Sequence, residues 1–331
     1  MSAPTPPSHP SHPGTGAIGD ALSATRNLPH QSQRGALVPN VMIPGVTHAG
    51  ASMVAADLGR HPQILLPVTK RIDHFTPIRF GRELDAGLAD YDLPFAAWSG
   101  QRYRIETSPV YLDGGPRMVS RIKDSLPGLR VIIVLRNPAD RLWTGYTDKL
   151  ARGKLPRAIS FETYVDRSLA LRANGADRFE GNRQFRTLSA GFYIEHLPAW
   201  LDAFGHRARV VFTEDLQDEP VQQLGALFDW LGLDPAEAAL PDPPGRQQDS
   251  PLWSGPQVPA VDRRAWPMLH RAPGLWRQSD LYRASLARRV PRQSERLRHR
   301  VRSLYAGANL ELATGLRDRG YTGLPDWLTE S

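Results

Sequence analysis

Residues 131–135 read VIIVL and are followed at once by Arg136, Asn137 and Pro138. Five consecutive aliphatic side chains without polar alternation predict a strand that is buried on both faces, as in a parallel sheet covered by helices. Pro138 suits the first turn of a helix, because the N–H group that proline lacks would have no helical partner there. The stretch therefore predicts a strand, a turn and a helix, with Arg136 at the carboxyl edge of a sheet.

Shorter apolar runs and amphipathic segments lie on both sides of this strand. Strands are expected at 41–44, 64–66, 102–106 and 209–212, and helices at about 51–58, 116–126, 161–171, 189–204, 220–231 and 280–319. Strands that alternate with helices predict an α/β fold, a three-layer α/β/α arrangement around a central parallel sheet of about five strands. The helices after residue 280 would be additions to that core.

The composition excludes several classes of protein. The chain has 331 residues, of which 40% are hydrophobic and 23% charged, so wholesale disorder and a fibrous architecture are excluded. It has no run of 18 apolar residues, and its first residues lack the basic and apolar regions of a secretory signal. The absence of cysteine excludes disulfides and thiolate metal sites. We therefore expect a cytoplasmic protein without a membrane segment or a bound metal.

The chain divides into a tail and one domain. Residues 1–40 contain seven prolines and no aromatic residue, which predicts a disordered tail, and the domain is expected to span 41–331. Within the domain, 241–262 is rich in Pro, Gly and Gln and predicts a long loop, and 263–325 is basic and helical.

Positive charge is concentrated near the C-terminal end. The net charge is +7, and residues 263–302 alone carry 12 arginines against two acidic residues. Such a segment favours an anionic partner, although a solvated basic face explains it as well. A nucleic-acid binder would show affinity that falls steeply with salt. The aromatic residues among the arginines are more simply explained by helix packing, so no nucleic-acid partner is expected.

A glycine-containing turn, GVTHAGAS at residues 45–52, lies between the first predicted strand and the first predicted helix. It has the shape of a phosphate-binding loop, with Ala51 where that loop has lysine, and it makes the fold P-loop-like. Glycines let the backbone N–H groups turn inward, and the helix start adds the positive end of its dipole. The alternative is a plain tight turn. The candidate anion-binding residues are Gly45, Thr47, His48, Ala49, Gly50, Ala51 and Ser52.

A second anion site is expected after the strand at 131–135. This strand ends in Arg136 and not in the aspartate that would hold Mg²⁺, which argues against a metal-assisted kinase or nucleoside triphosphatase. Thr144, eight residues further on and about two helical turns away, is expected to bring its hydroxyl to the same phosphate. Arg141 is interpreted as a structural residue that ties the helix to the sheet.

These blocks resemble the sulfotransferases that use 3′-phosphoadenosine 5′-phosphosulfate (PAPS), above all their bacterial and heparan-type carbohydrate branch. The turn at 45–52 is similar to the loop for the donor's 5′-phosphosulfate, and 135–146 to the elements that hold its 3′-phosphate through Arg136 and Thr144. Weaker similarities extend the match over about 41–328 and include Glu106-Thr107-Ser108-Pro109, Tyr193, Glu214-Asp215-Leu216, Tyr305, Asn309 and Trp327.

The resemblance implies a single α/β domain that transfers a sulfuryl group without a metal. PAPS would be the co-substrate, adenosine 3′,5′-bisphosphate (PAP) the product, and a hydroxyl or amine of a small molecule or carbohydrate the acceptor. The resemblance also places Tyr193 in the donor-binding set. The acceptor would attack in line, aided by a base, while donor groups stabilise the leaving phosphate.

The sequence departs from the family pattern at the residues closest to the chemistry. His48 stands where the family has lysine, and Thr107 follows Glu106 where a lysine is common. Arg71 occupies the position of a glutamate that is a candidate base, and it cannot accept a proton. The hypothesis is that His48 donates to the leaving group and that Asp73 or His74 is the base, with His74 favoured by its ordinary pKa.

Two further interpretations stay open beside an active enzyme with altered acid–base groups. One is a homologue that binds the nucleotide with little or no transfer. The other is a degenerate P-loop kinase or nucleoside triphosphatase, which would bind ATP together with Mg²⁺. The active enzyme is favoured because histidine can donate or accept a proton, so His48 and His74 can replace the lysine and the glutamate of the family pattern.

Overall fold

The computed structural model describes residues 37–69, 71–84, 88, 91–238 and 294–329. The elements below all belong to the unit that spans Val38–Ser331. The predicted tail up to residue 36, the loop predicted at 241–262 and the basic segment before 294 lie outside the described residues. Residues 38–40 are ordered against the sheet, where the Asn40 amide donates to Arg102 O (2.8 Å).

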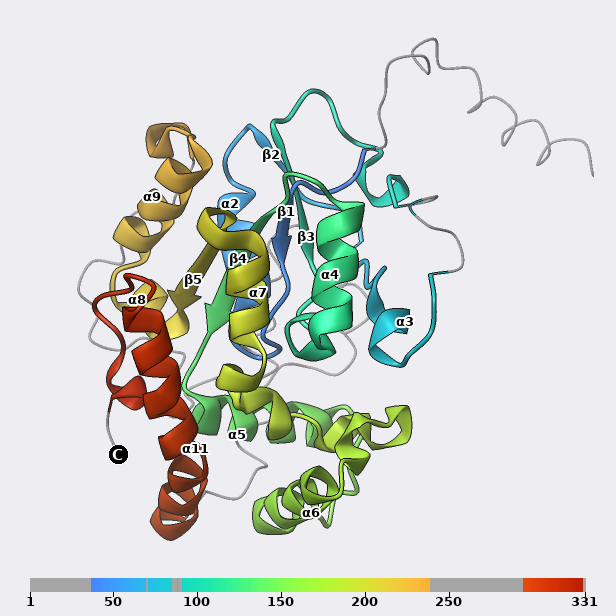
Figure 1. The fold of residues 1–331 in the computed structure, drawn as a ribbon, viewed down its shortest axis with the longest axis vertical. Coiled ribbons are helices and arrows are strands. Elements are labelled where there is room, and N and C mark those ends of the chain that lie inside the picture. Colours follow the sequence, from blue (N-terminus) through green and yellow to red (C-terminus); the bar gives the residue numbers. More distant parts are fainter. Residues whose placement is uncertain (1–36, 70, 85–87, 89–90, 239–293, 330–331) are drawn as a thin grey trace, which may run out of the picture. The chain divides into compact units, whose positions relative to one another are not determined.

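Five strands form one parallel sheet in the order β2-β3-β1-β4-β5 (Figure 1). They are β1 (Val41–Ile43), β2 (Ile64–Leu65), β3 (Tyr103–Thr107), β4 (Arg130–Leu135) and β5 (Ala208–Phe212). In β4, every side chain from Val131 to Leu135 is fully buried, as an uninterrupted apolar run requires. The predicted α/β class with about five parallel strands is confirmed.

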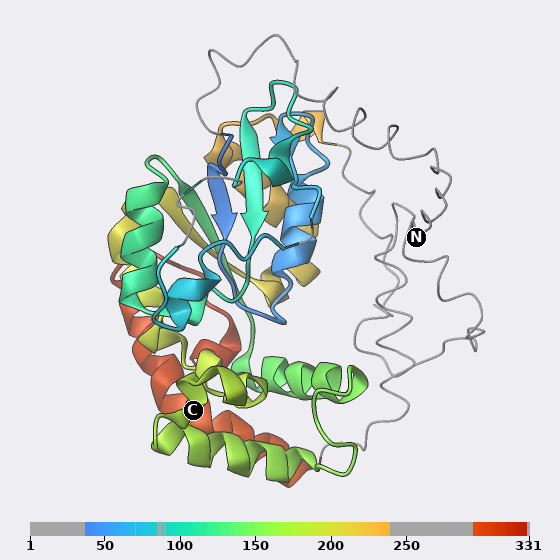
Figure 2. The same ribbon diagram turned by 90° about the vertical axis from the view of Figure 1, so that its right-hand side faces the viewer.

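Helices cover both faces of the sheet (Figures 1 and 2). The helices α4 (Pro116–Ser125) and α7 (Leu197–Phe204) lie on one face, and α2 (Ala51–Leu58) and α9 (Pro220–Leu231) pack together on the other. Each turns an apolar face inward: α9 buries Leu224, Leu227, Phe228 and Leu231, which follow the spacing of one helical face. The shorter helices on these two layers are α3 (Thr76–Arg79) and α8 (Thr213–Asp218).

Three further helices lie beyond the carboxyl ends of the strands, below the arrowheads in Figure 2. They are α5 (Pro138–Ala151), α6 (Phe161–Ala173) and α11 (Glu295–Arg317), and an aromatic second core joins them. Asn137 caps α5 by accepting the Ala139 N–H (3.0 Å), and Pro138 occupies its first turn as predicted. In α11, Tyr305 and Leu316 are buried while the Arg298 and Arg300 side chains are about half exposed.

The single helix predicted at 189–204 is wrong. The chain forms two 3₁₀ turns, η6 (Ser189–Gly191) and η7 (Tyr193–Glu195), before α7 begins at Leu197. Pro198 has no N–H group to donate, so it is accommodated in the first turn of α7 and not inside a longer helix. A methyl group at Gly191 would lie 2.8 Å from the Tyr305 ring, so this tight turn against α11 needs glycine.

The remaining short segments are 3₁₀ turns between the main elements. They are η2 (Leu93–Phe95), η3 (Leu112–Gly114), η4 (Ala176–Arg178), η5 (Glu180–Phe185), η8 (Gly205–Arg207), η9 (Pro235–Glu237) and η11 (Asp326–Leu328). None of the helices in the described parts of the chain has both the length and the apolar character needed to span a bilayer.

Candidate functional site

The turn after β1 is held between the turns that follow the two neighbouring strands. Val46 N–H donates to Val134 O of β4 (2.9 Å), and Val134 N–H donates to Gly45 O (2.9 Å). On the other side, Thr47 Oγ1 donates to Pro109 O (3.0 Å) after β3. A methyl group at Gly45 would lie 2.7 Å from Leu112 Cβ, so this close approach requires glycine. The backbone of the loop is therefore fixed before any ligand binds.

The loop leads into the N-terminal end of α2. Gly50 adopts a left-handed conformation (φ 88°), and Ala51 and Ser52 form the first helical positions. N–H groups in the first turn of a helix have no partner inside the helix and carry its positive dipole end. No acidic residue lies in the first turn of α2, and Ser52 is half-buried. These features suit a bound anion.

Arg136 connects this loop to helix α5. Its Nη1 donates to His48 O (3.2 Å) and to Thr144 Oγ1 (3.2 Å). The Thr144 hydroxyl donates to Asp140 O (2.9 Å), one turn earlier in α5. Arg136 is largely buried, which lowers the pKa of its guanidinium. The structure thus brings the loop at 45–52, Arg136 and Thr144 into one continuous region.

Two buried residues support this region from behind. The Tyr193 hydroxyl donates to Arg136 O (2.7 Å), so Tyr193, predicted to bind the donor, holds the backbone of a predicted ligand residue. Arg141 is fully buried and donates to Thr47 O (3.3 Å) and Thr187 O (2.6 Å). Arg141 therefore ties α5 to the loop, in agreement with its interpretation as a structural residue.

A buried carboxyl group lies at the end of β3. Glu106 is fully buried and accepts hydrogen bonds from Ser108 Oγ (2.7 Å), from the Tyr111 hydroxyl (2.9 Å) and from the Tyr91 hydroxyl. Burial raises the pKa of Glu106 to about 7. The sequence feature that could have revealed the buried state of Glu106 is its position as the single carboxylate in a strand that is otherwise buried.

The Glu106 network positions the segment that carries the predicted bases. Asp73 N–H donates to Ser108 Oγ (3.1 Å), and Phe75 N–H donates to the Tyr111 hydroxyl (2.9 Å). Because Pro109 O accepts from Thr47, this segment and the loop at 45–52 share the turn after β3. The network therefore fixes the backbone on both sides of His74.

The two candidate bases have different surroundings. One carboxylate oxygen of Asp73 pairs with Arg71 Nη2 at 3.1 Å. The ring of His74 stacks on Tyr91, with ring centroids 4.2 Å apart and planes 6° apart. His74 is half-buried, so its imidazole is oriented by an aromatic face and still reaches the surface.

His48 and Asp73 share an unusual backbone conformation. Among the residues that the structure describes, they are the two non-glycine residues with positive φ, at 68° and 53°. A side chain in this region costs about 1 kcal/mol or more, and such conformations cluster at functional sites. The sequence predicts a chemical role for both residues.

Lys149, which no sequence pattern singled out, packs on the part of α5 that also contacts His48. Lys149 Nζ donates to Gly145 O (3.3 Å) and to Thr187 Oγ1. A methyl group at Gly145 would lie 3.2 Å from His48 Cδ2, so the histidine packs on the same part of α5. Burial, and then the charge of Arg141, lowers the pKa of Lys149 to about 7. The sequence feature that could have revealed Lys149 is its spacing of four residues from Gly145 and eight from Arg141, which places the three residues on one helical face.

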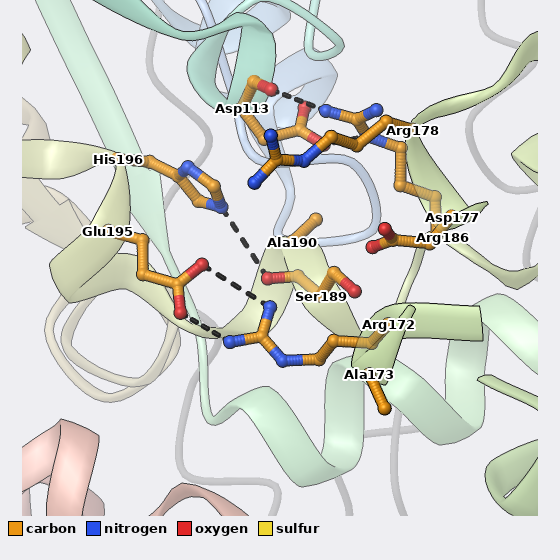
Figure 3. A pocket seen from close by; sticks show the side chains of 10 residues that line it. All are labelled: Asp113, Arg172, Ala173, Asp177, Arg178, Arg186, Ser189, Ala190, Glu195 and His196. Atoms are coloured by element: carbon orange, nitrogen blue, oxygen red, sulfur yellow. Dashed lines mark hydrogen bonds and ion pairs between the residues drawn. The ribbon is translucent and has the colours of Figure 1, made fainter. Parts of the chain in front are cut away.

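A polar pocket of about 420 Å³ lies beside η3 (Figure 3). Its walls come from η3, the end of α6 and the turns from η4 to η7, and none of the predicted site residues lines it. The lining residues are Asp113, Arg172, Ala173, Asp177, Arg178, Arg186, Ser189, Ala190, Glu195 and His196. Arg186 pairs with Asp113 (2.8 Å) and Arg172 pairs with Glu195, so much of the wall charge is already neutralised.

Glu106 and Lys149 should give the free energy of unfolding opposite pH dependences. Glu106 in the folded chain binds more protons than in the unfolded chain between pH 4.5 and about 7, so stability should fall with rising pH there. The expected loss is about 3 kcal/mol. Lys149 in the folded chain binds fewer protons between about pH 7 and 10.5, so stability should rise across that range.

Urea unfolding at about pH 5, 7 and 9 checks this expectation. Glu106→Gln should flatten the acid side of the profile, and Lys149→Met should flatten the alkaline side. If the stability of Glu106→Gln still falls between pH 5 and 7, that pH dependence comes from groups other than Glu106.

The comparisons with known proteins agree with this geometry. Residues 94–242 match the sulfotransferase domain family. Bifunctional heparan sulfate N-deacetylase/N-sulfotransferase 1 of Caenorhabditis briggsae is 24% identical over 305 residues, which are 89% of this chain and 32% of the relative. Heparan sulfate glucosamine 3-O-sulfotransferase 6 of Mus musculus is 29% identical over 198 residues, which are 59% of this chain and 52% of the relative. The chain thus spans about a third to a half of the length of these relatives.

A solved structure shares the fold. The sulfotransferase from Alicyclobacillus acidocaldarius superposes with a TM-score of 0.50 at 25% identity, over 72% of this chain and 98% of that one. The residues that match the family include Glu106, Arg136 and Thr144, and the structure places the last two together. Residues 94–242 thus match the sulfotransferase domain family, and the chain is distantly similar to heparan sulfate sulfotransferases and to a bacterial sulfotransferase.

Proposed function

We propose that this protein is an active sulfotransferase that moves a sulfuryl group from PAPS to a hydroxyl or amine of a small-molecule or carbohydrate acceptor. The observation that carries the proposal is the position of Arg136, whose guanidinium contacts both the phosphate loop at His48 O and the helix α5 at Thr144. A doubly phosphorylated nucleotide needs two such anion-binding elements side by side. PAPS would supply the activated sulfuryl group.

The residues present suit the two ends of this donor. The fixed loop at 45–52 and the first turn of α2 offer N–H groups to the 5′ end. Arg136 and Thr144 offer a guanidinium and a hydroxyl to the 3′-phosphate. Glu214 follows β5 at the same edge of the sheet. Its carboxylate accepts the Asn137 N–H (2.8 Å) and so holds the turn after β4 in place. This arrangement favours the bisphosphate over ATP with Mg²⁺.

The chemistry requires a proton acceptor and a group that stabilises the leaving phosphate. As the acceptor oxygen or nitrogen bonds to sulfur, the bond from sulfur to the bridging phosphate oxygen breaks, and the acceptor's proton passes to a base. His74, held on the ring of Tyr91, is the proposed base, with Asp73 as the alternative. His48 is the proposed hydrogen-bond donor to the leaving oxygen, because it lies in the loop that faces the 5′ end.

The acceptor class is proposed from the relatives. The names of those relatives assign them heparan sulfate and its glucosamine, so a carbohydrate acceptor is the first to test. The polar pocket beside η3 is lined by arginines, carboxylates and a serine, which suits a ligand rich in hydroxyl groups.

A thermal-shift titration tests the donor assignment. PAP at about 100 times its Kd should stabilise the protein by about 2.7 kcal/mol, while ATP with Mg²⁺ should stabilise it less at equal concentration. A preference for ATP would favour the degenerate kinase instead. Binding of PAP without transfer from labelled PAPS to a panel of sugars, phenols and amines would favour a nucleotide-binding homologue that lacks activity.

His48→Ala should lower the rate of sulfuryl transfer by about 100-fold, the usual effect of removing one donor to a developing oxyanion. PAP affinity should change much less, and His48→Lys should restore or exceed the native rate. The measurement is single-turnover transfer from labelled PAPS, with the exposed His206→Ala as the matched control. Undiminished turnover in His48→Ala would reject this role.

A further inference from the structure

One face of helix α5 points toward the phosphate loop. Arg141, Gly145 and Lys149 follow each other at intervals of four residues and so lie on this face. Arg141 donates to Thr47 O in the loop, and Gly145 packs against His48. Lys149 is the last of the three, and its amine donates to Gly145 O and to Thr187 Oγ1.

We propose that Lys149 supplies the positive charge at the sulfuryl end of the donor site, a charge that the loop itself lacks at His48 and Ala51. The proposal rests on the function proposed above, and it assigns the positive charge near the sulfuryl group to a residue outside the loop. It predicts that Lys149 gains a proton when the 5′-phosphate end of the nucleotide binds.

The side chains of Lys149 and His48 both approach α5 at Gly145. A methyl group at Gly145 would lie 2.7 Å from Thr187 Cγ2 and 3.2 Å from His48 Cδ2, so both side chains converge on one point of α5. Lys149 Nζ donates to the hydroxyl of that same threonine. His48 and Lys149 therefore approach one small region from the loop and from the helix.

The other described lysines do not fit this role. Lys123 on α4 and Lys154 after α5 are exposed, whereas Lys149 is half-buried with its amine held between α5 and Thr187. Among these three residues, Lys149 is thus the one whose amine is held at Gly145, where His48 also packs.

The charges around Lys149 favour an anion. Both oxygens that accept its hydrogen bonds are neutral, and Arg141, Arg152 and Lys154 add positive charge around it. Asp148 offsets this in part, but it also pairs with Arg152 (2.9 Å). Burial and these cations hold the pKa of Lys149 at about 7. A phosphate or sulfuryl oxygen nearby would raise it again and draw in a proton.

The experiment compares three nucleotides by calorimetry: PAP, adenosine 5′-monophosphate and adenosine 3′-monophosphate. Lys149→Met should weaken PAP and the 5′-monophosphate by about tenfold or more and leave the 3′-monophosphate unchanged. Titrations at about pH 8 in buffers of different ionisation enthalpy should show proton uptake on PAP binding by the native chain and less by Lys149→Met. Lys123→Met is the matched control and should behave as the native chain.

The outcomes separate this inference from the proposed function. If the native chain does not bind PAP, the proposed function fails. If it binds PAP but Lys149→Met has unchanged affinity for the 5′-monophosphate and unchanged proton uptake, the role of Lys149 fails alone. Lys149→Arg, which keeps the charge and does not titrate near neutrality, should retain affinity while losing the proton uptake. Equal weakening of all three nucleotides by Lys149→Met would indicate a structural role.

Discussion

Arg136→Met is expected to lower the affinity for PAP by about 100-fold or more, the largest binding effect of any single change in this protein. The guanidinium contacts both the loop and Thr144, and it is largely buried, so its charge acts on a bound phosphate with little screening by water. Methionine fills a similar volume without the charge. Calorimetric titration with PAP measures the effect directly.

Two comparisons make this result specific. Arg117→Met removes an exposed arginine of α4 and should leave PAP affinity unchanged. Adenosine 5′-monophosphate should still bind to Arg136→Met, because the loop at 45–52 keeps its hydrogen bonds to Val134 and Pro109. PAP affinity within threefold of the native value would remove Arg136 from the donor site, and with it the observation on which the proposed function depends.

The strands could be predicted from local pattern, because burial on both faces leaves a clear mark in the sequence. The run at 131–135 has no polar residue, and the shorter runs of β1 and β5 carry the same mark. Their order in the sheet could not be predicted this way. That β1 lies between β3 and β4 depends on contacts between segments up to 90 residues apart, such as Val41 beside Arg130.

The two predicted anion-binding elements lie next to each other for a general reason. The carboxyl ends of parallel strands meet at one edge of the sheet, so a loop after β1 and an arginine after β4 can approach each other. The sequence identified both elements, and the structure supplies their contact, Arg136 Nη1 to His48 O (3.2 Å). The role of each residue toward a ligand stays a prediction.

Other features depend on tertiary packing that no local pattern records. Burial raises the pKa of Glu106 and lowers that of Lys149, and both groups contact residues distant in sequence, Tyr91 and Thr187 respectively. The prediction of one helix at 189–204 was wrong because it followed the amphipathic pattern and disregarded Pro198 and Gly191. The need for glycine at 191 could not be read locally, because the Tyr305 ring that packs against it lies on α11.

A buried ion-pair cluster holds the turn after β3, on which both the phosphate loop and the Asp73 segment depend. Asp113 in η3 is nearly fully buried, pairs with Arg79 and Arg186, and accepts the Arg186 Nε hydrogen bond at 2.8 Å. Burial alone would raise the pKa of Asp113, but the two arginines lower it to about 2. The cluster therefore stabilises the fold at every pH above about 4 and loses this contribution as the pH falls toward 2.

Asp113→Ala is expected to lower the free energy of unfolding by about 3–5 kcal/mol, because it leaves Arg79 and Arg186 largely buried without their carboxylate. Urea unfolding at neutral pH measures the loss. Glu83→Ala, which removes an exposed partner of Arg117, is the matched control and should cost less than about 1 kcal/mol. Equal losses in the two variants would show that the cluster contributes no more than a surface pair. Because Leu112 and Pro109 in the same turn contact Gly45 and Thr47, the variant should also bind PAP more weakly even at temperatures where it remains folded.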